Sequence, residues 1–269
     1  MKTTSYLNLN FDHGSLLDRV DRAGAAGVSG IECYGWDLGL EGEQSAPDTF
    51  QGANGDLLEL AAKIESHDME WIYLSGNRPP LTDPTQADRA IESIERSLRL
   101  ADDLGIRYVN VKAGSTQSTF THQRQLNQVI ETLQTVAPIA EAANASLLLE
   151  PLNPIEDPGQ FIHTAADGLS IIRVVDSPGV GLLLDFYHEQ LSAGNLINTV
   201  RDVDWDRIPH IHIADPPNRT QPGTGEVNWD SVLQALVEEG YTGYLGGEFR
   251  PAGDPVDALA SFVRLGERY

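Results

Sequence analysis

Short apolar segments with strand-forming composition alternate with longer amphipathic segments along the whole chain. The short segments have the length of strands, and the amphipathic segments repeat their apolar residues with the period of helices. Eight strands are predicted, at residues 6–10, 30–34, 70–74, 108–112, 146–150, 180–185, 210–214 and 244–248.

Helices are predicted between these strands, at residues 16–26, 57–67, 87–104, 123–143, 165–175, 191–200, 229–239 and 255–265. Gly27, Gly105 and Gly240 follow three of them, where a left-handed C-cap is expected. Strict alternation of strands and helices predicts a parallel sheet, and eight repeats favour a closed (β/α)8 barrel over an open sheet. We therefore expect one α/β barrel domain over residues 1–269.

Three segments rich in Gly, Pro, Asn and Asp each follow a predicted strand, at residues 36–55, 75–86 and 215–228. In a parallel barrel, the loops that follow strands all lie at the C-terminal mouth, where active sites are found. We expect these loops to cover a site there.

The chain is strongly acidic, with 40 Asp and Glu against 18 Lys and Arg and a formal net charge of −22. The acids are spread along the sequence, which is typical of proteins from salt-loving organisms, where high salt screens repulsion at the surface. A surface of this charge repels nucleic acid and anionic membranes. We expect a halophilic protein with no nucleic-acid or membrane partner.

Neither a membrane span nor a secretory signal is visible, since no apolar segment approaches the ~18 residues of a span. A soluble cytoplasmic protein is therefore predicted. The single cysteine, Cys33, excludes a disulfide within the chain and is interpreted as a buried, inert thiol.

The chemistry gathers at one repeated position. Four successive strands each carry an acid or a histidine near the C-terminal end: Glu150, Asp185, His212 and Glu248. Their separations of 35, 27 and 36 residues are each about one βα repeat, so the four side chains are predicted to meet at one mouth. Three converging carboxylates would repel one another unless a cation lay between them. Oxygen ligands with one imidazole suit Mn²⁺ or Mg²⁺, with Co²⁺ and Zn²⁺ as further candidates.

Three other residues are candidates for binding a substrate. His188 lies three residues beyond Asp185 and is placed to bond a substrate oxygen, while Arg219 offers a fork of donors for the carboxylate of a keto acid. Lys112 ends a predicted strand and is one of only three lysines, which suggests a role facing the substrate. His210 lies deeper on the strand of His212 and is interpreted as structural.

Several motifs resemble the hydroxypyruvate isomerase family of xylose-isomerase-like barrels. They are Glu150-Pro-Leu-Asn153, Leu184-Asp185-Phe-Tyr-His188, His210-Ile-His-Ile-Ala-Asp215, Pro222-Gly-Thr-Gly-Glu-Val-Asn228 and Gly247-Glu248-Phe-Arg-Pro251. The resemblance is specific over residues 146–251 and looser before them. It implies a metal held by Glu150, Asp185, position 212 and Glu248, with His188 and Arg219 contacting the substrate.

One position departs from that family, in which glutamine is typical where this chain has His212. Ketose 3-epimerases similar to D-tagatose and D-psicose 3-epimerase have histidine there, and Glu156 matches an acid that binds substrate in those epimerases. The resemblance therefore leaves two substrates open. The first is hydroxypyruvate, converted to tartronate semialdehyde, and the second is a ketose epimerised at carbon 3.

Both reactions need one proton removed beside a carbonyl and returned through a cis-enediolate. The resemblance assigns these proton transfers to Glu150 and Glu248. A metal-dependent endonuclease of the same superfamily is a rival hypothesis, but it needs further metal-binding histidines and a basic track for DNA. A sugar-binding barrel without turnover is a second rival, and it has no need for two opposed acid/base groups. A homo-oligomer is also compatible with the family.

Overall fold

The computed structural model describes residues 1–40, 54–76 and 79–269. Its strands form a closed parallel barrel in sequential order, which confirms the predicted (β/α)8 fold. The strands are β1 (Thr3–Tyr6), β2 (Gly30–Tyr34), β3 (Glu70–Ser75), β4 (Tyr108–Val111), β5 (Ser146–Leu149), β6 (Val180–Asp185), β7 (His210–Ile213) and β8 (Leu245–Gly247).

Helices occupy the segments between the strands. The α-helices are α1 (Leu7–Asn10), α2 (Leu16–Ala26), α3 (Asn54–Ser66), α4 (Ala87–Leu104), α5 (His122–Ala142), α6 (Ala165–Val175), α7 (Phe186–Ser192), α8 (Leu196–Asp202), α9 (Trp229–Glu238) and α10 (Pro255–Gly266). Short 3₁₀ helices η1 (Gly35–Leu38), η2 (Pro84–Gln86) and η3 (Trp205–Arg207) complete the described elements.

Two compact units can be distinguished within the chain. Unit 1 comprises Met1–Tyr73, Leu196–Arg201 and His210–Tyr269, and unit 2 comprises Leu74–Asn195 and Asp202–Pro209. In unit 1, β1 pairs with β2 and β8, and β7 pairs with β8. In unit 2, β5 pairs with β4 and β6. A single domain over the whole chain stays a prediction.

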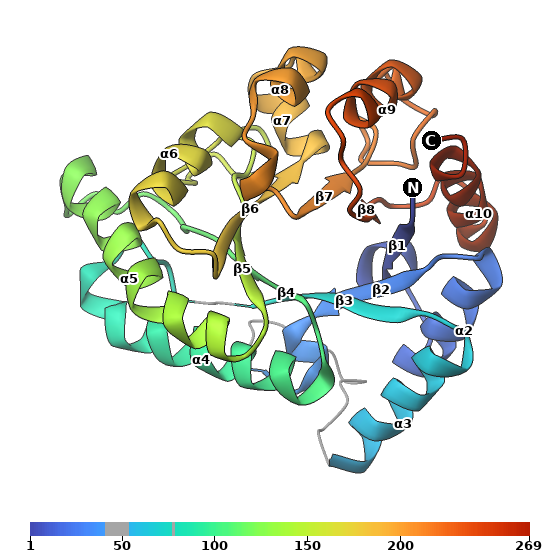
Figure 1. The fold of residues 1–269 in the computed structure, drawn as a ribbon, viewed down its shortest axis with the longest axis horizontal. Coiled ribbons are helices and arrows are strands. Elements are labelled where there is room, and N and C mark those ends of the chain that lie inside the picture. The colour runs from blue at the N-terminus through green and yellow to red at the C-terminus, as the bar shows by residue number, and fades with distance from the viewer. Residues whose placement is uncertain (41–53, 77–78) are drawn as a thin grey trace. The chain divides into compact units, whose positions relative to one another are not determined.

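Each unit packs its helices in pairs beside the strands. In unit 1, α2 lies against α3 and α10, and in unit 2, α5 lies against α4 and α6 (Figure 1). The helix bounds follow local signals: Ser15 and Asp18 form a capping box at the start of α2, and Gly27 and Gly105 end α2 and α4 in the left-handed conformation, as predicted.

The strands are buried along their length, which explains their apolar sequences. Every residue of β6 and of β7 is buried, including the polar residues His210, His212 and Asp185. The thiol of Cys33 on β2 is also buried, and burial raises its pKa well above the ordinary value. That is the environment expected of an inert thiol.

The first predicted strand was placed too late in the sequence. Residues 6–10 read as a strand because apolar and polar residues alternate there, but the strand is Thr3–Tyr6 and Leu7–Asn10 form one helical turn. The asparagines cause the difference, because Asn8 accepts a hydrogen bond from the Tyr34 backbone N–H and Asn10 bonds backbone carbonyls near β8. Such side-chain bonds compete with strand pairing.

The predicted helix at 191–200 was also wrong, since two short helices, α7 and α8, cover this region. The chain breaks between them at Gly194 and Asn195, whose φ angles are +64° and +57°. Two successive left-handed residues cannot continue a right-handed helix. Every other predicted helix lies within three residues of its observed bounds.

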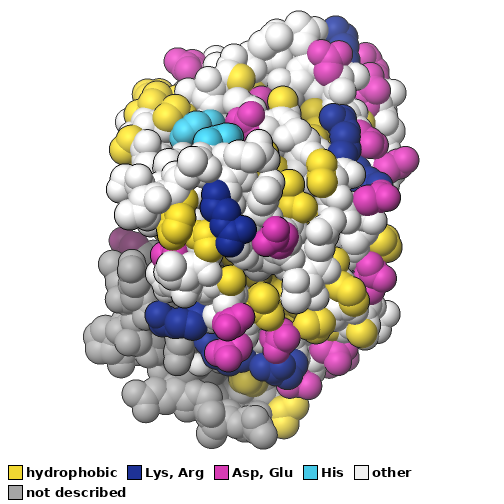
Figure 2. Space-filling model, turned by 90° about the vertical axis from the view of Figure 1, so that its left-hand side faces the viewer, with side chains coloured by type: hydrophobic (Ala, Val, Ile, Leu, Met, Phe, Trp, Pro, Cys, Tyr) yellow, Lys and Arg dark blue, Asp and Glu magenta, His cyan; other side chains and the backbone are white. Residues whose placement is uncertain are grey.

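Of the three predicted loops, residues 41–53 and 77–78 lie outside the described residues. The loop at 215–228 is described throughout and contains the cis peptide bond Pro216-Pro217. On the face shown in Figure 2, acidic side chains are spread among apolar and basic ones and do not gather in one patch. Within the described part of the chain, every helix is too short or too polar to span a bilayer.

Candidate functional site

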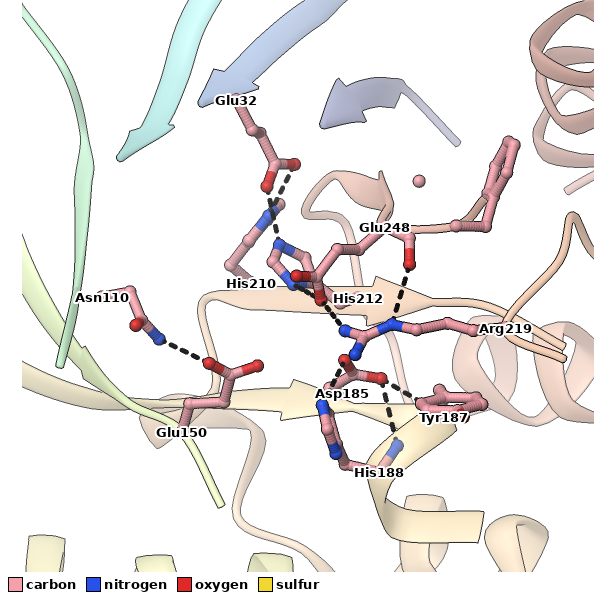
Figure 3. Close-up of polar contacts among 12 residues, drawn as sticks. Glu32, Asn110, Glu150, Asp185, Tyr187, His188, His210, His212, Arg219 and Glu248 are labelled. Atoms are coloured by element: carbon pink, nitrogen blue, oxygen red, sulfur yellow. Dashed lines mark hydrogen bonds and ion pairs between the residues drawn. The ribbon is translucent and has the colours of Figure 1, made fainter. Parts of the chain in front are cut away.

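Glu150 follows β5 directly, and the neighbouring strand β4 holds it in place. Its backbone N–H donates to the carbonyl of Val111 at 3.0 Å, which extends the strand pairing by one residue. The side chain is 3% exposed, and its Oε2 accepts a hydrogen bond from Asn110 Nδ2 at 2.9 Å (Figure 3). Lys112 Nζ lies 3.7 Å from the same oxygen. An amide and an ammonium thus hold one oxygen of a buried carboxylate.

Asp185 ends β6 and also caps the helix that follows. Its Oδ1 accepts hydrogen bonds from the backbone N–H groups of Tyr187 and His188, at 2.7 and 3.3 Å. Its Oδ2 lies 3.6 Å from His188 Nε2. One oxygen therefore fixes the start of α7, while the other faces the histidine that was predicted to contact substrate.

The surroundings of His188 determine which of its nitrogens carries hydrogen. Nδ1 accepts a hydrogen bond from the backbone N–H of Asn153 at 3.0 Å. A backbone N–H can only donate, so Nδ1 has no hydrogen and the ring is the neutral Nε2–H tautomer. His188 is buried and presents an N–H donor on the side of Asp185.

Glu156 lies on the loop after β5 and is exposed. Its Oε1 accepts a hydrogen bond from the hydroxyl of Tyr187 at 2.8 Å. Its backbone N–H, like that of Ile155, donates to Asn153 Oδ1. Asn153 therefore connects the loop that carries Glu156 to His188.

In unit 1, His212 and Glu248 are adjacent side chains from the neighbouring strands β7 and β8. His212 Nδ1 lies 3.1 Å from Glu248 Oε2. Arg219 Nη2 donates to the same Glu248 oxygen at 2.6 Å and is itself only 11% exposed (Figure 3). Glu248 is thus placed between an imidazole and a guanidinium.

Behind His212 lies Glu32 on β2, which the sequence did not single out. Glu32 Oε2 lies 2.6 Å from His212 Nε2, and Oε1 lies 3.1 Å from His210 Nε2 and accepts a hydrogen bond from Thr4. Glu32, His210 and His212 are all 0% exposed. His210 belongs to this buried group, in keeping with its interpretation as structural.

Charges in this buried group shift its pKa values. Burial alone raises the pKa of Glu32, but the charges and hydrogen bonds of His212 and His210 outweigh burial and lower the pKa to about 2. Burial alone lowers the pKa of His212, and the carboxylates of Glu32 and Glu248 reverse this and raise it well above the ordinary value. For His210 burial prevails, so its pKa is lowered.

Two buried polar residues support Glu248 and Arg219, and sequence reasoning missed both roles. Asn10 Nδ2 donates to the carbonyls of Gly247 and Phe249, on either side of Glu248. Asp215 is fully buried and accepts hydrogen bonds from four backbone N–H groups of the loop that carries Arg219. Those N–H groups belong to Gly223, Thr224, Gly225 and Val227. The Gly-Thr-Gly run of the motif at 222–228 therefore folds around Asp215.

The predicted metal ligands lie at the ends of β5, β6, β7 and β8, which are consecutive in the closed barrel. Glu150 and Asp185 in unit 2 and His212 and Glu248 in unit 1 are all buried, and all four are residue types that could bind a metal ion. Three buried carboxylates carry like charges whose desolvation is costly without a cation. The donor set of oxygens and one imidazole therefore fits a divalent metal.

Residues 20–265 match the family model of the xylose isomerase-like TIM barrel. Hydroxypyruvate isomerase from Escherichia coli is 26% identical over 93% of this chain and 94% of its own length. A putative hydroxypyruvate isomerase from Xenopus laevis is 31% identical over 74% of this chain and 77% of its own. The 2-oxo-tetronate isomerase of Haemophilus influenzae is 24% identical over 98% of both chains.

Solved structures share the fold at lower identity. A family 2 AP endonuclease from Brucella melitensis aligns over 98% of this chain and 99% of its own, with a TM-score of 0.85 and 23% identity. A 3-keto-D-glucoside 4-epimerase from Escherichia coli aligns over all of both chains, with a TM-score of 0.82 and 23% identity. Because these identities are low, the two structures bear on the fold alone.

The family model covers most of the chain, and the curated relatives are named isomerases. The chain belongs to the xylose isomerase-like TIM barrel family and is an enzyme of the isomerase class.

Proposed function

We propose that this enzyme isomerises a small α-hydroxy carbonyl compound at one divalent metal ion held by Glu150, Asp185, His212 and Glu248. The proposal is supported by the burial of all four residues, by their place on consecutive strands and by their donor chemistry. Mn²⁺ and Mg²⁺ suit this set of oxygens and one imidazole best, with Co²⁺ and Zn²⁺ as alternatives.

The chain's own residues supply the proton transfers. A bound cation would polarise the substrate carbonyl and so acidify the adjacent C–H. Glu150 and Glu248 are the proposed proton carriers, one removing the proton and the other returning it. Asn110 and Lys112 fix one oxygen of Glu150, and Arg219 fixes one oxygen of Glu248, so each carboxylate is held in a defined orientation.

The substrate we propose is hydroxypyruvate, with tartronate semialdehyde as its product. The observation that carries this choice is the guanidinium of Arg219, which is nearly buried and 2.6 Å from Glu248. A guanidinium beside the proton carrier is suited to pair with a substrate carboxylate, which hydroxypyruvate has and a simple ketose lacks. The Nε2–H of His188 is the proposed donor to a substrate oxygen.

A ketose 3-epimerase is the second candidate, and the position of Glu156 favours it. Glu156 is exposed on the loop after β5 and is oriented by the hydroxyl of Tyr187. An oriented carboxylate of this kind accepts hydrogen bonds from sugar hydroxyls. Hydroxypyruvate has fewer hydroxyl groups than a ketose to offer it.

The experiment starts from chelator-treated protein reloaded separately with Mn²⁺, Mg²⁺, Co²⁺ or Zn²⁺. Each sample is given hydroxypyruvate, a panel of ketoses or an abasic duplex, and products are followed by NMR in D₂O. We expect turnover of hydroxypyruvate only in reloaded samples, with deuterium on the product carbon. Full activity without metal would refute the metal site, and turnover of ketoses alone would establish the epimerase. Cleavage of the duplex would instead support an endonuclease.

Substitution of Arg219 tests the substrate class separately. Arg219→Gln removes the guanidinium, so we expect KM for hydroxypyruvate to rise by about 10-fold or more, because charged hydrogen bonds contribute roughly 1.5–3 kcal/mol. Arg201→Gln is the matched control, since Arg201 is an exposed residue of α8 paired with Glu238 at 3.9 Å. Equal KM values for the two variants would argue against a carboxylate substrate.

A further inference from the structure

The buried carboxylate of Glu32 has no part in the proton transfers described above, yet its two oxygens contact two histidines of β7. Oε2 lies 2.6 Å from His212 Nε2 and Oε1 lies 3.1 Å from His210 Nε2. The hydroxyl of Thr4 on β1 also donates to Oε1. Side chains of two other strands, β1 and β7, therefore fix both oxygens of a side chain that water does not reach.

An ionised carboxylate has lone pairs and no hydrogen to donate. The hydrogen in the contact between Glu32 and His212 therefore lies on Nε2 of the imidazole. The other ring nitrogen, Nδ1, faces Glu248 Oε2 at 3.1 Å. The contact of Nε2 with Glu32 is the shorter of the two, so a cation would displace the hydrogen at Nδ1, on the side of Glu248, and the hydrogen at Nε2 would stay in its bond to Glu32. A histidine needs a lone pair to ligate a metal, and the hydrogen bond at its other nitrogen selects which one is used.

We propose that Glu32 is the positioning residue of the metal site, which fixes the His212 ring and its Nε2–H tautomer so that Nδ1 is the nitrogen offered to the cation. This inference rests on the proposed metal-dependent function. It adds a residue outside the four ligands and names the ligating atom of His212.

An independent feature of β8 supports this arrangement. Gly246 pairs with His212 in the parallel register. A Cβ atom at position 246 would lie 2.4 Å from His212 Cδ2 and 2.8 Å from Glu32 Oε1. Both contacts are far closer than van der Waals distance, so the absence of a side chain at Gly246 makes room for the pair. The backbone at Gly246 therefore packs closely against both Glu32 and His212.

A second reading of the same residues is that Glu32, His210 and His212 themselves hold an ion, since their residue types would allow it. We favour the positioning role because both Glu32 oxygens already contact nitrogen–hydrogen or hydroxyl donors. The two readings differ in the number of ions per chain, which a titration measures.

The experiment compares the wild-type chain with Glu32→Gln, Gly246→Ala and the control Glu70→Gln. Glu70 is another strand acid, partly exposed and bonded to Tyr244, and it lies outside the proposed site. Each metal-free protein is titrated with Mn²⁺ by calorimetry. We expect one ion per chain in every protein, with affinity unchanged in Glu70→Gln and about 10–100-fold weaker in Glu32→Gln and Gly246→Ala, the usual effect of losing an outer partner of a ligand.

A measurement on the wild-type chain keeps the test independent of how the variants fold. Nitrogen NMR of the Zn²⁺-loaded protein should show His212 with hydrogen on Nε2 and the metal on Nδ1. The opposite assignment overturns the proposal, and so does an unchanged affinity in folded Glu32→Gln. Two ions in the wild type and one in Glu32→Gln would replace it with the second-ion reading. A wild-type chain that binds no ion would overturn the proposed function itself, and this inference with it.

Discussion

Asn10 fixes the backbone on both sides of Glu248, because its side-chain amide donates hydrogen bonds to the carbonyls of the two residues that flank the glutamate. The distances are 2.9 Å to Gly247 and 2.8 Å to Phe249, and Asn10 Oδ1 accepts a hydrogen bond from Ser5. The amide thus replaces strand pairing at the point where β8 ends. The position of a proposed proton carrier depends on a residue more than 200 positions earlier in the chain.

Asn10→Ala is expected to leave these two carbonyls without their donor and to destabilise the fold by about 1–3 kcal/mol. Because the backbone around Glu248 loses its hydrogen bonds, kcat should fall by a larger factor than KM rises. Chemical denaturation and steady-state kinetics measure the two effects. Asn127→Ala on the exposed face of α5 is the control and should change neither. A variant as stable and active as the wild type would show that Asn10 does not position Glu248.

Asp215→Asn is expected to loosen the loop that carries Arg219. The Asp215 carboxylate accepts hydrogen bonds from four backbone N–H groups. An asparagine side chain has an NH₂ donor in place of one of the two accepting oxygens, and this donor would face the same N–H groups. We expect the free energy of unfolding to fall by at least about 1.5–3 kcal/mol. KM should rise because Arg219 is no longer held in place. Amide hydrogen exchange measures the loosening directly at Gly223, Thr224, Gly225 and Val227. Protection as strong as in the wild type would contradict this role.

Glu150→Gln and Glu248→Gln each keep an oxygen that can bind metal but remove a proton carrier. Each variant should retain the metal and lose about 10²–10⁴-fold in rate. The double variant should be little slower than either single one, since the two groups act as a unit. Metal content by mass spectrometry and rates in D₂O check both expectations. Rates near those of the wild type in both single variants would refute the two-glutamate mechanism.

Salt should stabilise the folded protein, because the net charge of −22 creates repulsion that ions screen. We expect the melting temperature to rise as KCl increases from dilute buffer towards molar concentrations. Sucrose at matched water activity is the control, because it is excluded from the protein surface but does not screen charge. A melting temperature that stays flat or falls with KCl would count against a halophilic protein.

Asp21 on α2 gives a prediction for acid pH. Hydrogen bonds from Lys63, at 2.8 Å, and from His67, at 2.7 Å, lower the pKa of this carboxyl below its ordinary value of 3.8. A lowered folded-state pKa means that the pair stabilises the fold above the unfolded-state pKa, and that this stability is lost as the pH falls through the folded-state pKa.

Asp21→Asn should therefore cost up to about 1 kcal/mol at neutral pH, the usual limit for a pair this exposed. The difference should begin to shrink below about pH 4 and should vanish once the pH is below the folded-state pKa. Unfolding free energies of both proteins, measured from pH 2 to pH 7, check how this difference depends on pH. Glu92→Gln, an exposed acid on α4, removes the same charge and should show a smaller, more even difference. A difference that persists unchanged at pH 3 would rule out the ionised pair as its cause.

The sequence predicted α2, α4 and α6 to the residue, because caps and amphipathic stripes are local signals. Thr3–Tyr6 was missed because its threonines and serine are polar, although the strand is wholly buried. The hydroxyl of Thr4 bonds Glu32, which lies 28 positions along the chain, and that of Ser5 bonds Asn10, which lies beyond the strand. A polar strand of this kind gives no local hydrophobic signal.

The proposed ligands were also found by a local rule, since each lies near the end of a strand. The supporting residues obey no such rule. Asn110 and Asn10 act through contacts across 40 and more than 200 positions of sequence. Glu32 was the one visible exception, because an acid between Ile31 and Cys33 in a buried strand requires a partner. The sequence therefore indicates that Glu32 needs a partner, but it does not identify the histidines that bond it.

The lack of a side chain at Gly246 makes the residues at positions 32, 212 and 246 depend on one another. Any side chain there would displace His212 and Glu32. A relative with a larger residue at position 246 should therefore lack either the histidine at 212 or the acid at 32. If position 246 changes first, the new side chain clashes with this pair, and if position 32 or 212 changes first, the remaining partner is buried without its hydrogen bond. Substitutions at positions 32, 212 and 246 should accordingly appear as a correlated set among relatives.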